Sequence, residues 1–265
     1  MTGKTIAPEI CRIDRCDVRY PKRLLTVLDN KAPQTLYLQG NADLLISDSV
    51  GFCGSRKSSR KGIETAIDCA TQAAMGGVTV VSGNAAGIDF EAHYHALAVG
   101  GMTILVLPEG MHHFRIKRAL APVWDWSRIL VISQFNPDDV WKSYRAMTRN
   151  RVIIGLSKAM IVIEAGERGG TMNAGMETLK YTIPLYVAEY HDMSVDARGN
   201  KRLLELGGHR VARSRSTARA NMKPIFAHIQ GDPVTVSKRI TRDYGDREFE
   251  YRPSQNVMAQ ASRVD

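Results

Sequence analysis

Four glycine-containing segments carry residue types that could hold phosphate groups. Each combines glycine with a polar or charged neighbour, and they are Gly54-Ser55-Arg56-Lys57, Ser82-Gly83, Glu109-Gly110 and Gly169-Gly170-Thr171. Glycine lets an anion approach the main chain closely, while hydroxyl and guanidinium groups donate hydrogen bonds to phosphate oxygens. The pattern predicts phosphate-binding loops, although a turn followed by a helix cap remains the plainer interpretation of any single loop.

The segments follow apolar, β-branched runs that are typical of buried strands. These runs lie at residues 49–53, 78–82, 103–107, 128–133, 160–164 and 183–188. Helical patterns separate most of them, at residues 61–75, 90–100 and 143–157. The alternation predicts an α/β fold: a Rossmann-like, doubly wound, mostly parallel sheet with helices on both faces. Ligands of such sheets bind beyond the carboxyl ends of the strands, where helix starts add partial positive charge for phosphate.

Length and composition indicate one main domain in a protein that could bind a polyanion. We expect an N-terminal extension over residues 1–45 that packs on the core, a Rossmann-like domain over 46–208, and a basic C-terminal appendage over 209–265. The 36 Lys and Arg residues exceed the 27 Asp and Glu residues, which gives a net charge of +9. No apolar stretch is long enough for a signal sequence or a membrane span, so we expect a cytoplasmic protein without a membrane partner.

Six stretches of the chain resemble the DNA-processing protein A (DprA) family, also called Smf. They are residues 20–41, 54–62, 80–97, 103–110, 149–157 and 162–175, of which SGNAAGIDFEAH and RNRVIIGLS are the most specific. The resemblance implies a Rossmann-like core that binds single-stranded DNA, acts as a homodimer, and hands the DNA to a RecA-type recombinase during uptake or recombination. Gly169 and Gln134 depart from the residues usual in the family, which suggests a divergent member.

The resemblance also indicates which residues would bind DNA. Arg56 matches the arginine of the family's G-S-R loop. Arg149 and Arg151 lie two residues apart on a helix, so one could meet DNA while the other holds the fold through a carboxylate such as Asp89. Phe114 and Tyr144 are the nearest candidates for base stacking. The expected DNA and phosphate site comprises Gly54, Ser55, Arg56, Lys57, Ser82, Gly83, Gly110, Arg149, Arg151, Gly169, Gly170 and Thr171.

An enzymatic function remains the alternative. Glu164 ends a strand beside the expected phosphate site, and Glu177 follows the late glycine loop, so a related fold could hydrolyse or sense nucleoside monophosphates through these acids. The glycine spacing differs from the PGGxGTxxE pattern of such hydrolases. The chain also lacks the P-loop and GxGxxG patterns, and its Cys and His residues lack zinc-ligand spacing. We therefore expect a binding protein without a cofactor or a metal.

Overall fold

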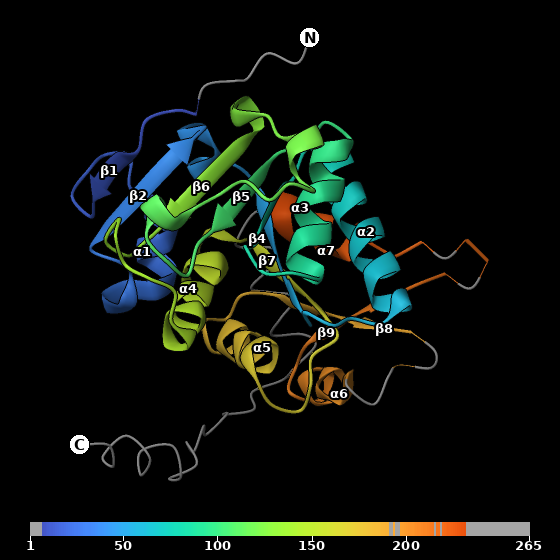
Figure 1. Cartoon of the computed structure of the whole chain (residues 1–265). Helices are drawn as coiled ribbons and strands as arrows, with labels where there is room; N and C mark the ends of the chain where they lie inside the picture. Colours follow the sequence, from blue (N-terminus) through green and yellow to red (C-terminus); the bar gives the residue numbers. More distant parts are fainter. Residues whose placement is uncertain (1–6, 191–192, 194–196, 215, 218, 232–265) are drawn as a thin grey trace. The chain divides into compact units, whose positions relative to one another are not determined.

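The computed structural model describes residues 7–190, 193, 197–214, 216–217 and 219–231. They build a nine-stranded mixed sheet with the strand order β1-β2-β6-β5-β4-β3-β7-β8-β9 (Figure 1). The strands are β1 (Cys11–Asp14), β2 (Thr35–Gly40), β3 (Ser49–Gly54), β4 (Thr79–Gly83), β5 (Thr103–Val106), β6 (Ile129–Ser133), β7 (Ala159–Ile163), β8 (Leu185–Glu189) and β9 (His209–Ala212).

Strands β3 to β9 are mutually parallel, whereas β2 pairs antiparallel with both β1 and β6. Every residue of β4, β5, β6 and β7 is buried. Such continuous burial explains why these strands appear in the sequence as unbroken apolar runs. The expected α/β, Rossmann-like fold is confirmed.

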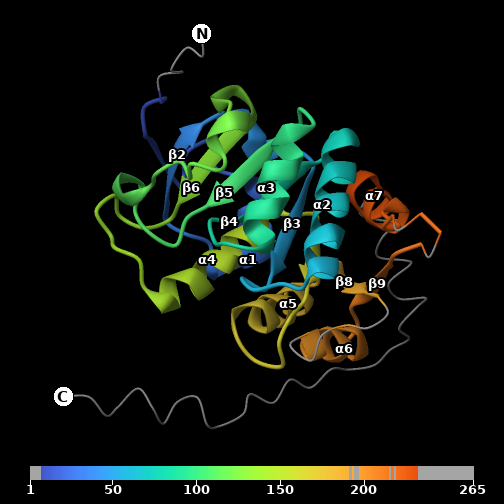
Figure 2. The ribbon, with the colours of Figure 1, turned by 45° about the vertical axis from the view of Figure 1, so that its right-hand side comes forward.

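Helices cover both faces of the sheet. Side chains of α2, α3 and α7 pack in the core on one face, and those of α1, α4, α5 and α6 pack in the core on the other (Figures 1 and 2). The helices are α1 (Lys22–Leu28), α2 (Arg60–Met75), α3 (Ile88–Ala98), α4 (Ser143–Leu156), α5 (Gly170–Lys180), α6 (Arg198–Glu205) and α7 (Lys223–Gln230). In the part of the chain that the structure describes, no helix has the length and apolar character needed to cross a membrane.

Both ends of the described chain are continuous with the sheet. The N-terminal segment adds β1 and β2 to one edge. At the other edge, β9 pairs with β8 and α7 buries Ile225 and Ile229 against the core, so the compact unit extends past residue 208 to Gln230. The expected appendage therefore does not begin at residue 209, because residues 209–212 pair in the sheet. Its part from 232 to 265 lies outside the described residues.

The chain reverses its direction of winding between β3 and β7. These strands are neighbours in the sheet, yet β3 leads into α2 on one face and β7 leads into α5 on the other. The two outgoing loops therefore diverge at the carboxyl ends of the strands. In open parallel sheets this switch point is where ligands bind, so it defines the region in which to look for a site.

Candidate nucleic-acid interface

Two glycines bring the loop after β3 close to its neighbours at the switch point. A Cβ on Gly54 would lie 2.3 Å from the carbonyl oxygen of Ile163, so the pairing of β3 with β7 leaves no room for a side chain. Gly87 has a φ of +73°, and a Cβ there would lie 2.6 Å from the carbonyl oxygen of Ser55. Both positions therefore serve close backbone packing that glycine alone permits.

The loop from Ser55 to Ser59, here called the cationic loop, is ordered by its own serines. The Ser55 hydroxyl accepts a hydrogen bond from the backbone N–H of Lys57 at 3.0 Å. The Ser58 hydroxyl donates to the carbonyl oxygen of Ser55, also at 3.0 Å. Arg56 and Lys57 are exposed between these contacts. The loop thus presents two cations to solvent at the switch point.

Glu164 fills the start of α2. The backbone N–H of Ser59 donates to its Oε2 at 2.7 Å, and the Ser59 hydroxyl donates to its Oε1 at 2.5 Å. A Cβ on Gly62 would lie 2.6 Å from the Glu164 carboxyl carbon. A helix start favours an anion, and here the protein supplies its own. Any phosphate at this helix start would therefore lie close to the Glu164 carboxylate.

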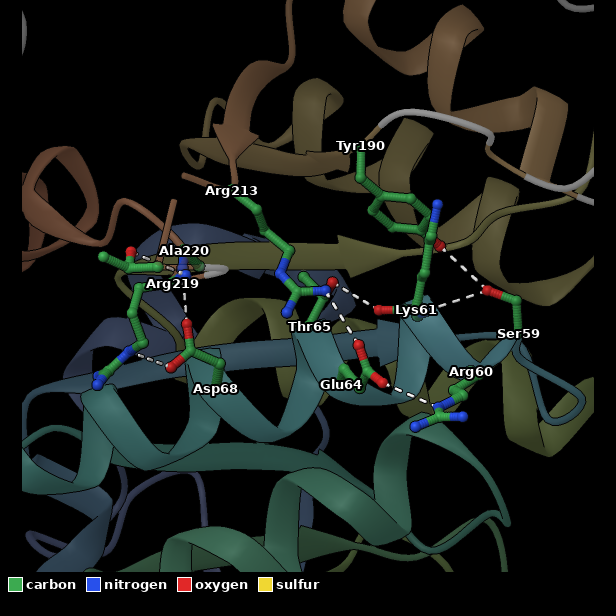
Figure 3. A network of polar contacts seen from close by, with 12 residues as sticks. Ser59, Arg60, Lys61, Glu64, Thr65, Asp68, Tyr190, Arg213, Arg219 and Ala220 are labelled. Carbon is green, nitrogen blue, oxygen red and sulfur yellow. Dashed lines mark hydrogen bonds and ion pairs between the residues drawn. The ribbon is translucent and has the colours of Figure 1, made fainter. Parts of the chain in front are cut away.

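Tyr190 closes the same cluster from the end of β8. Its hydroxyl donates to Glu164 Oε1 and lies 3.4 Å from the Ser59 hydroxyl. Figure 3 shows Tyr190 pointing toward Ser59 at the start of α2. Burial raises the pKa of Tyr190, and its bond to Glu164 raises it further. The phenol therefore stays protonated and remains a donor to the carboxylate at neutral pH.

Acidic side chains engage the cations farther along α2. Glu64 contacts Arg60 at 3.1 Å and Arg213 at 3.6 Å, while Asp68 contacts Arg219 at 2.5 Å (Figure 3). Part of the basic segment after β9 thus docks on this helix through ion pairs. Several cations on or beside α2 are therefore already paired with carboxylates of this helix.

Arg149 lies inside the protein, across the ends of β4 and β5. It is 5% exposed, its Nη1 donates to the carbonyl oxygen of Val106 at 3.0 Å, and the same atom lies 4.0 Å from Asp89. A Cβ on Gly83 would overlap the guanidinium, so Gly83 provides the space that Arg149 fills. Burial lowers the pKa of Arg149, and Asp89 opposes that shift. Of the two predicted roles for the arginine pair, Arg149 thus has the structural one, which is to hold the fold. It does not face solvent.

The other residues of the second loop are also structural. The Ser82 hydroxyl lies 2.8 Å from the Phe52 carbonyl oxygen and 2.9 Å from Asp89 Oδ1, which share its single hydrogen, and Ser82 is fully buried. The buried His93 contacts the Gly83 carbonyl oxygen at 2.7 Å, and burial lowers its pKa to about 4. Neither Ser82 nor Gly83 is exposed for a phosphate contact in this conformation.

Arg151 lies on the opposite side of α4 from Arg149, as its spacing predicts. Its Nε donates to Glu177 on α5 at 2.9 Å. The guanidinium is about one-third exposed. Glu177 is therefore paired with an arginine between two helices, which leaves it poorly placed to act as a free catalytic acid.

The third loop contains a cation that sequence reasoning missed. Lys117 donates from Nζ to the carbonyl oxygens of Asn84 and Ala85, each at 2.8 Å, and burial lowers its pKa. No feature of the local sequence distinguishes Lys117 from the neighbouring Arg115 and Arg118.

Gly110, in the same loop, allows close packing of the backbone. A Cβ there would lie 2.1 Å from the carbonyl oxygen of Asn136.

The late glycine loop is open. Gly169 precedes α5 with a φ of +107°, and a Cβ placed on Gly169 or Gly170 would meet no atom within 4 Å. The N-cap residue of this helix is Gly169 itself, which has no side chain to cap it, and Thr171 on the first turn is partly buried. The start of α5 therefore lacks the side-chain cap that Ser59 gives α2, and its glycines border open space on the Cβ side.

The two aromatic candidates occupy different environments. Phe114 is 8% exposed and packs against Trp124, with ring centroids 5.9 Å apart, so it belongs to the core. Tyr144 is 57% exposed on the first turn of α4, and Trp141, which the sequence analysis did not select, is 48% exposed just before it. Tyr144 thus remains a candidate for stacking, whereas Phe114 does not.

The described residues at this edge of the sheet form no metal-binding cluster. Across the described ranges, no group of three or more His, Cys, Asp or Glu side chains could hold a metal ion. His112 and His113 both contact Asp138, at 2.8 and 3.0 Å, and so order the exposed loop after β5. Cys11, Cys16, Cys53 and Cys69 are free thiols.

Comparison with known proteins decides the family. A family model described as DNA recombination-mediator protein A matches residues 12–221. The chain belongs to this family. It is 35% identical over 167 residues to the DNA processing protein DprA of Streptococcus pneumoniae, and 38% identical over 157 residues to the protein Smf of Escherichia coli. The aligned regions cover 62% and 58% of this chain, but only 57% and 41% of those relatives.

Solved structures of the family share the fold. The crystal structure of DprA from Streptococcus pneumoniae superimposes with a TM-score of 0.69 at 29% identity, covering 77% of this chain and 71% of that one. DNA processing protein A from Helicobacter pylori, studied for its single-stranded DNA binding mode, gives a TM-score of 0.66 at 22% identity. That match covers 88% of this chain and 97% of the Helicobacter chain. The Rossmann-like core is thus common to all three proteins.

Proposed function

We propose that the protein binds single-stranded DNA along the strand-end edge of the sheet and does not turn it over chemically. The observation that carries the proposal is the cationic loop, which is ordered by its serines and presents Arg56 and Lys57 to solvent at the switch point. Family membership supports it, because the relatives are DNA processing proteins and the Helicobacter protein binds single-stranded DNA.

The proposed path of the DNA runs between the cationic loop and the start of α4. Arg56 and Lys57 would contact phosphates at one end, and Lys142, exposed just before α4, would contact them at the other. Lys117 uses two of its three ammonium N–H donors to hold the loop at Asn84 and Ala85, and the third would donate to a phosphate. Trp141 and Tyr144 expose aromatic rings on which bases could stack, an interaction that tolerates any sequence.

Binding through these cations should weaken strongly with salt. For about four phosphate contacts, counterion release predicts a loss of affinity of about fiftyfold between roughly 50 and 200 mM monovalent salt. Fluorescence anisotropy with a labelled oligothymidine across this range measures the slope directly. An affinity that stays flat over the range would contradict the proposal.

Nucleoside monophosphates serve to test the two alternatives, nucleotide hydrolysis and nucleotide sensing. Both oxygens of Glu164 lie within the cluster around Ser59, and Glu177 pairs with Arg151, so neither acid is placed as a free general acid or base. Incubation with nucleoside monophosphates, followed by chromatography, should release no free base. Base release lost in Glu164→Gln or Glu177→Gln would establish the enzyme instead, and calorimetric binding of free nucleotides without oligonucleotide binding would indicate a sensor.

The broader role follows from the family. We propose that the protein acts as a homodimer in the cytoplasm and presents DNA to a RecA-type recombinase during uptake or recombination. Sedimentation of the full chain, alone and with DNA, measures the oligomeric state. A pull-down with a recombinase on oligonucleotide-coated beads tests the hand-over, because recovery should require both DNA and the protein.

A further inference from the structure

Glu164 combines two unfavourable features in one residue. It has a φ of +52°, in the left-handed region that residues other than glycine rarely adopt, and it is 2% exposed. A buried carboxylate and a strained backbone each cost free energy unless the surroundings compensate. Here the compensation is local, because both carboxylate oxygens accept hydrogen bonds from Ser59 and one also accepts from Tyr190.

The contacts of Glu164 fix one end of the cationic loop. Ser59 is both the last residue of that loop and the N-cap of α2, since its hydroxyl accepts from the N–H of Gly62 at 3.1 Å. The other end is held where the N–H of Ile88 donates to the Ser55 carbonyl oxygen at 3.4 Å. The segment that carries Arg56 is therefore attached at both ends, and Glu164 provides the second attachment.

We propose that Glu164 is a positioning residue for DNA binding: its carboxylate holds Ser59 so that the cationic loop presents Arg56 toward a phosphate. The inference rests on the proposed function. A loop held in its binding conformation loses less conformational entropy when the ligand arrives, which raises affinity without adding a contact. Glu164 itself does not touch the DNA in this arrangement.

The proposal predicts a sign opposite to that of simple electrostatics. A carboxylate near a phosphate-binding loop repels the ligand, so its removal would raise affinity if charge alone mattered. If Glu164 positions the loop, its removal lowers affinity although the protein becomes more positive. The direction of the change therefore separates the two roles.

The experiment measures oligothymidine affinity of full-length variants by anisotropy, well below their melting temperatures. Glu164→Ala should bind about three- to tenfold more weakly, the range expected when one long side chain must be immobilised on binding. Glu164→Gly should behave in the same way, because glycine accepts the positive φ and only the carboxylate contacts are lost. Glu164→Gln, nearly isosteric, covers the case in which the smaller variants fold poorly, and it too should bind more weakly.

Two controls make the result specific. Glu64→Ala removes the same charge from the next turn of α2 and should leave affinity unchanged or slightly increased. In an Arg56→Ala background, Glu164→Ala should cause no further loss, because there is no guanidinium left to position. Equal or tighter binding by the Glu164 variants, or a loss that persists without Arg56, would overturn the proposal. A parent protein that does not bind oligonucleotide would instead refute the proposed function.

Discussion

The two helices that start at the switch point differ in what lies in front of their first turns. At α2, Glu164 accepts hydrogen bonds from Ser59, and a Cβ on Gly62 would lie 2.6 Å from the carboxyl carbon. At α5, Gly169 and Gly170 have nothing within 4 Å of a Cβ, and the N-cap residue, Gly169, has no side chain to cap the helix. One helix start is filled by an internal anion and the other is open.

This difference shows that a glycine-rich loop before a helix has two distinct structural uses. Before α2 the small residues let a carboxylate from the adjacent strand lie on the helix, and the cations of the loop turn outward. Before α5 they leave open space beside the main chain. At the start of α2 a phosphate would meet Glu164, so its favourable partners there are the side chains Arg56 and Lys57, whereas at the start of α5 the backbone has no such internal anion hydrogen-bonded to its N-cap.

The largest effect should come from the side chains at the filled start. Arg56→Ala removes a charge-assisted contact worth about 1.5 to 3 kcal/mol, which corresponds to a ten- to hundredfold loss of oligonucleotide affinity. Its stability should change by no more than about 0.5 kcal/mol, because the side chain is exposed. Lys57→Ala should weaken binding less and lower the salt slope by about one ion.

Arg60→Ala is the matched control for this measurement. Arg60 lies four residues farther on, is almost fully exposed, and pairs with Glu64. It should lose less than about threefold in affinity, since screened surface charges contribute little. If Arg56→Ala bound DNA like the parent but melted much earlier, Arg56 would be a structural residue and the DNA path would lie elsewhere.

The sequence was sufficient for the parallel part of the fold. The apolar runs at 49–53 and 160–164 correspond to β3 and β7 within one residue at each end. Strands buried on both faces leave such a continuous hydrophobic signal. The edge strands left a weaker signal. β9, with only Val211 buried, lies within an Arg-rich segment that appeared to be an appendage, and its pairing with β8 depends on contacts that composition does not encode.

The location of the DNA site stays a prediction, and the structure adds contacts that the sequence did not indicate. Arg56 and Lys57 are exposed as expected, and their role in binding stays a prediction. Glu164 was noticed only as an acid near the phosphates, because nothing local in the sequence indicates that its partners are Ser59, 105 residues earlier, and Tyr190. For the arginine pair, the sequence indicated Asp89 as a partner but not which arginine would meet it, and the structure shows that Arg149 lies beside Asp89 in the space left by Gly83.

A pair of alanine substitutions tests whether the filled and open starts differ in packing. Gly62→Ala places a methyl group against the Glu164 carboxyl, and overpacking of this kind costs about 1 to 3 kcal/mol. Gain in helix propensity offsets about 1 kcal/mol of that cost, so we expect a net destabilisation of up to about 2 kcal/mol. Gly170→Ala meets nothing and should not destabilise. Thermal and urea unfolding measure both, and equal stabilities would show that the start of α2 is not filled.

The smallest effect should come from the open start. Gly170→Pro removes one backbone N–H at the first position of α5 without changing charge, and proline is well tolerated at that position of a helix. If a DNA phosphate reaches this N–H, the variant loses one hydrogen bond of about 0.5 to 1.5 kcal/mol, a loss of roughly two- to twelvefold in affinity. Gly170→Ala keeps the N–H and serves as the control, with unchanged affinity. Parent-like binding by Gly170→Pro, measured at equal stability, would place the start of α5 outside the DNA path and leave the side chains of the cationic loop as the phosphate contacts at the switch point.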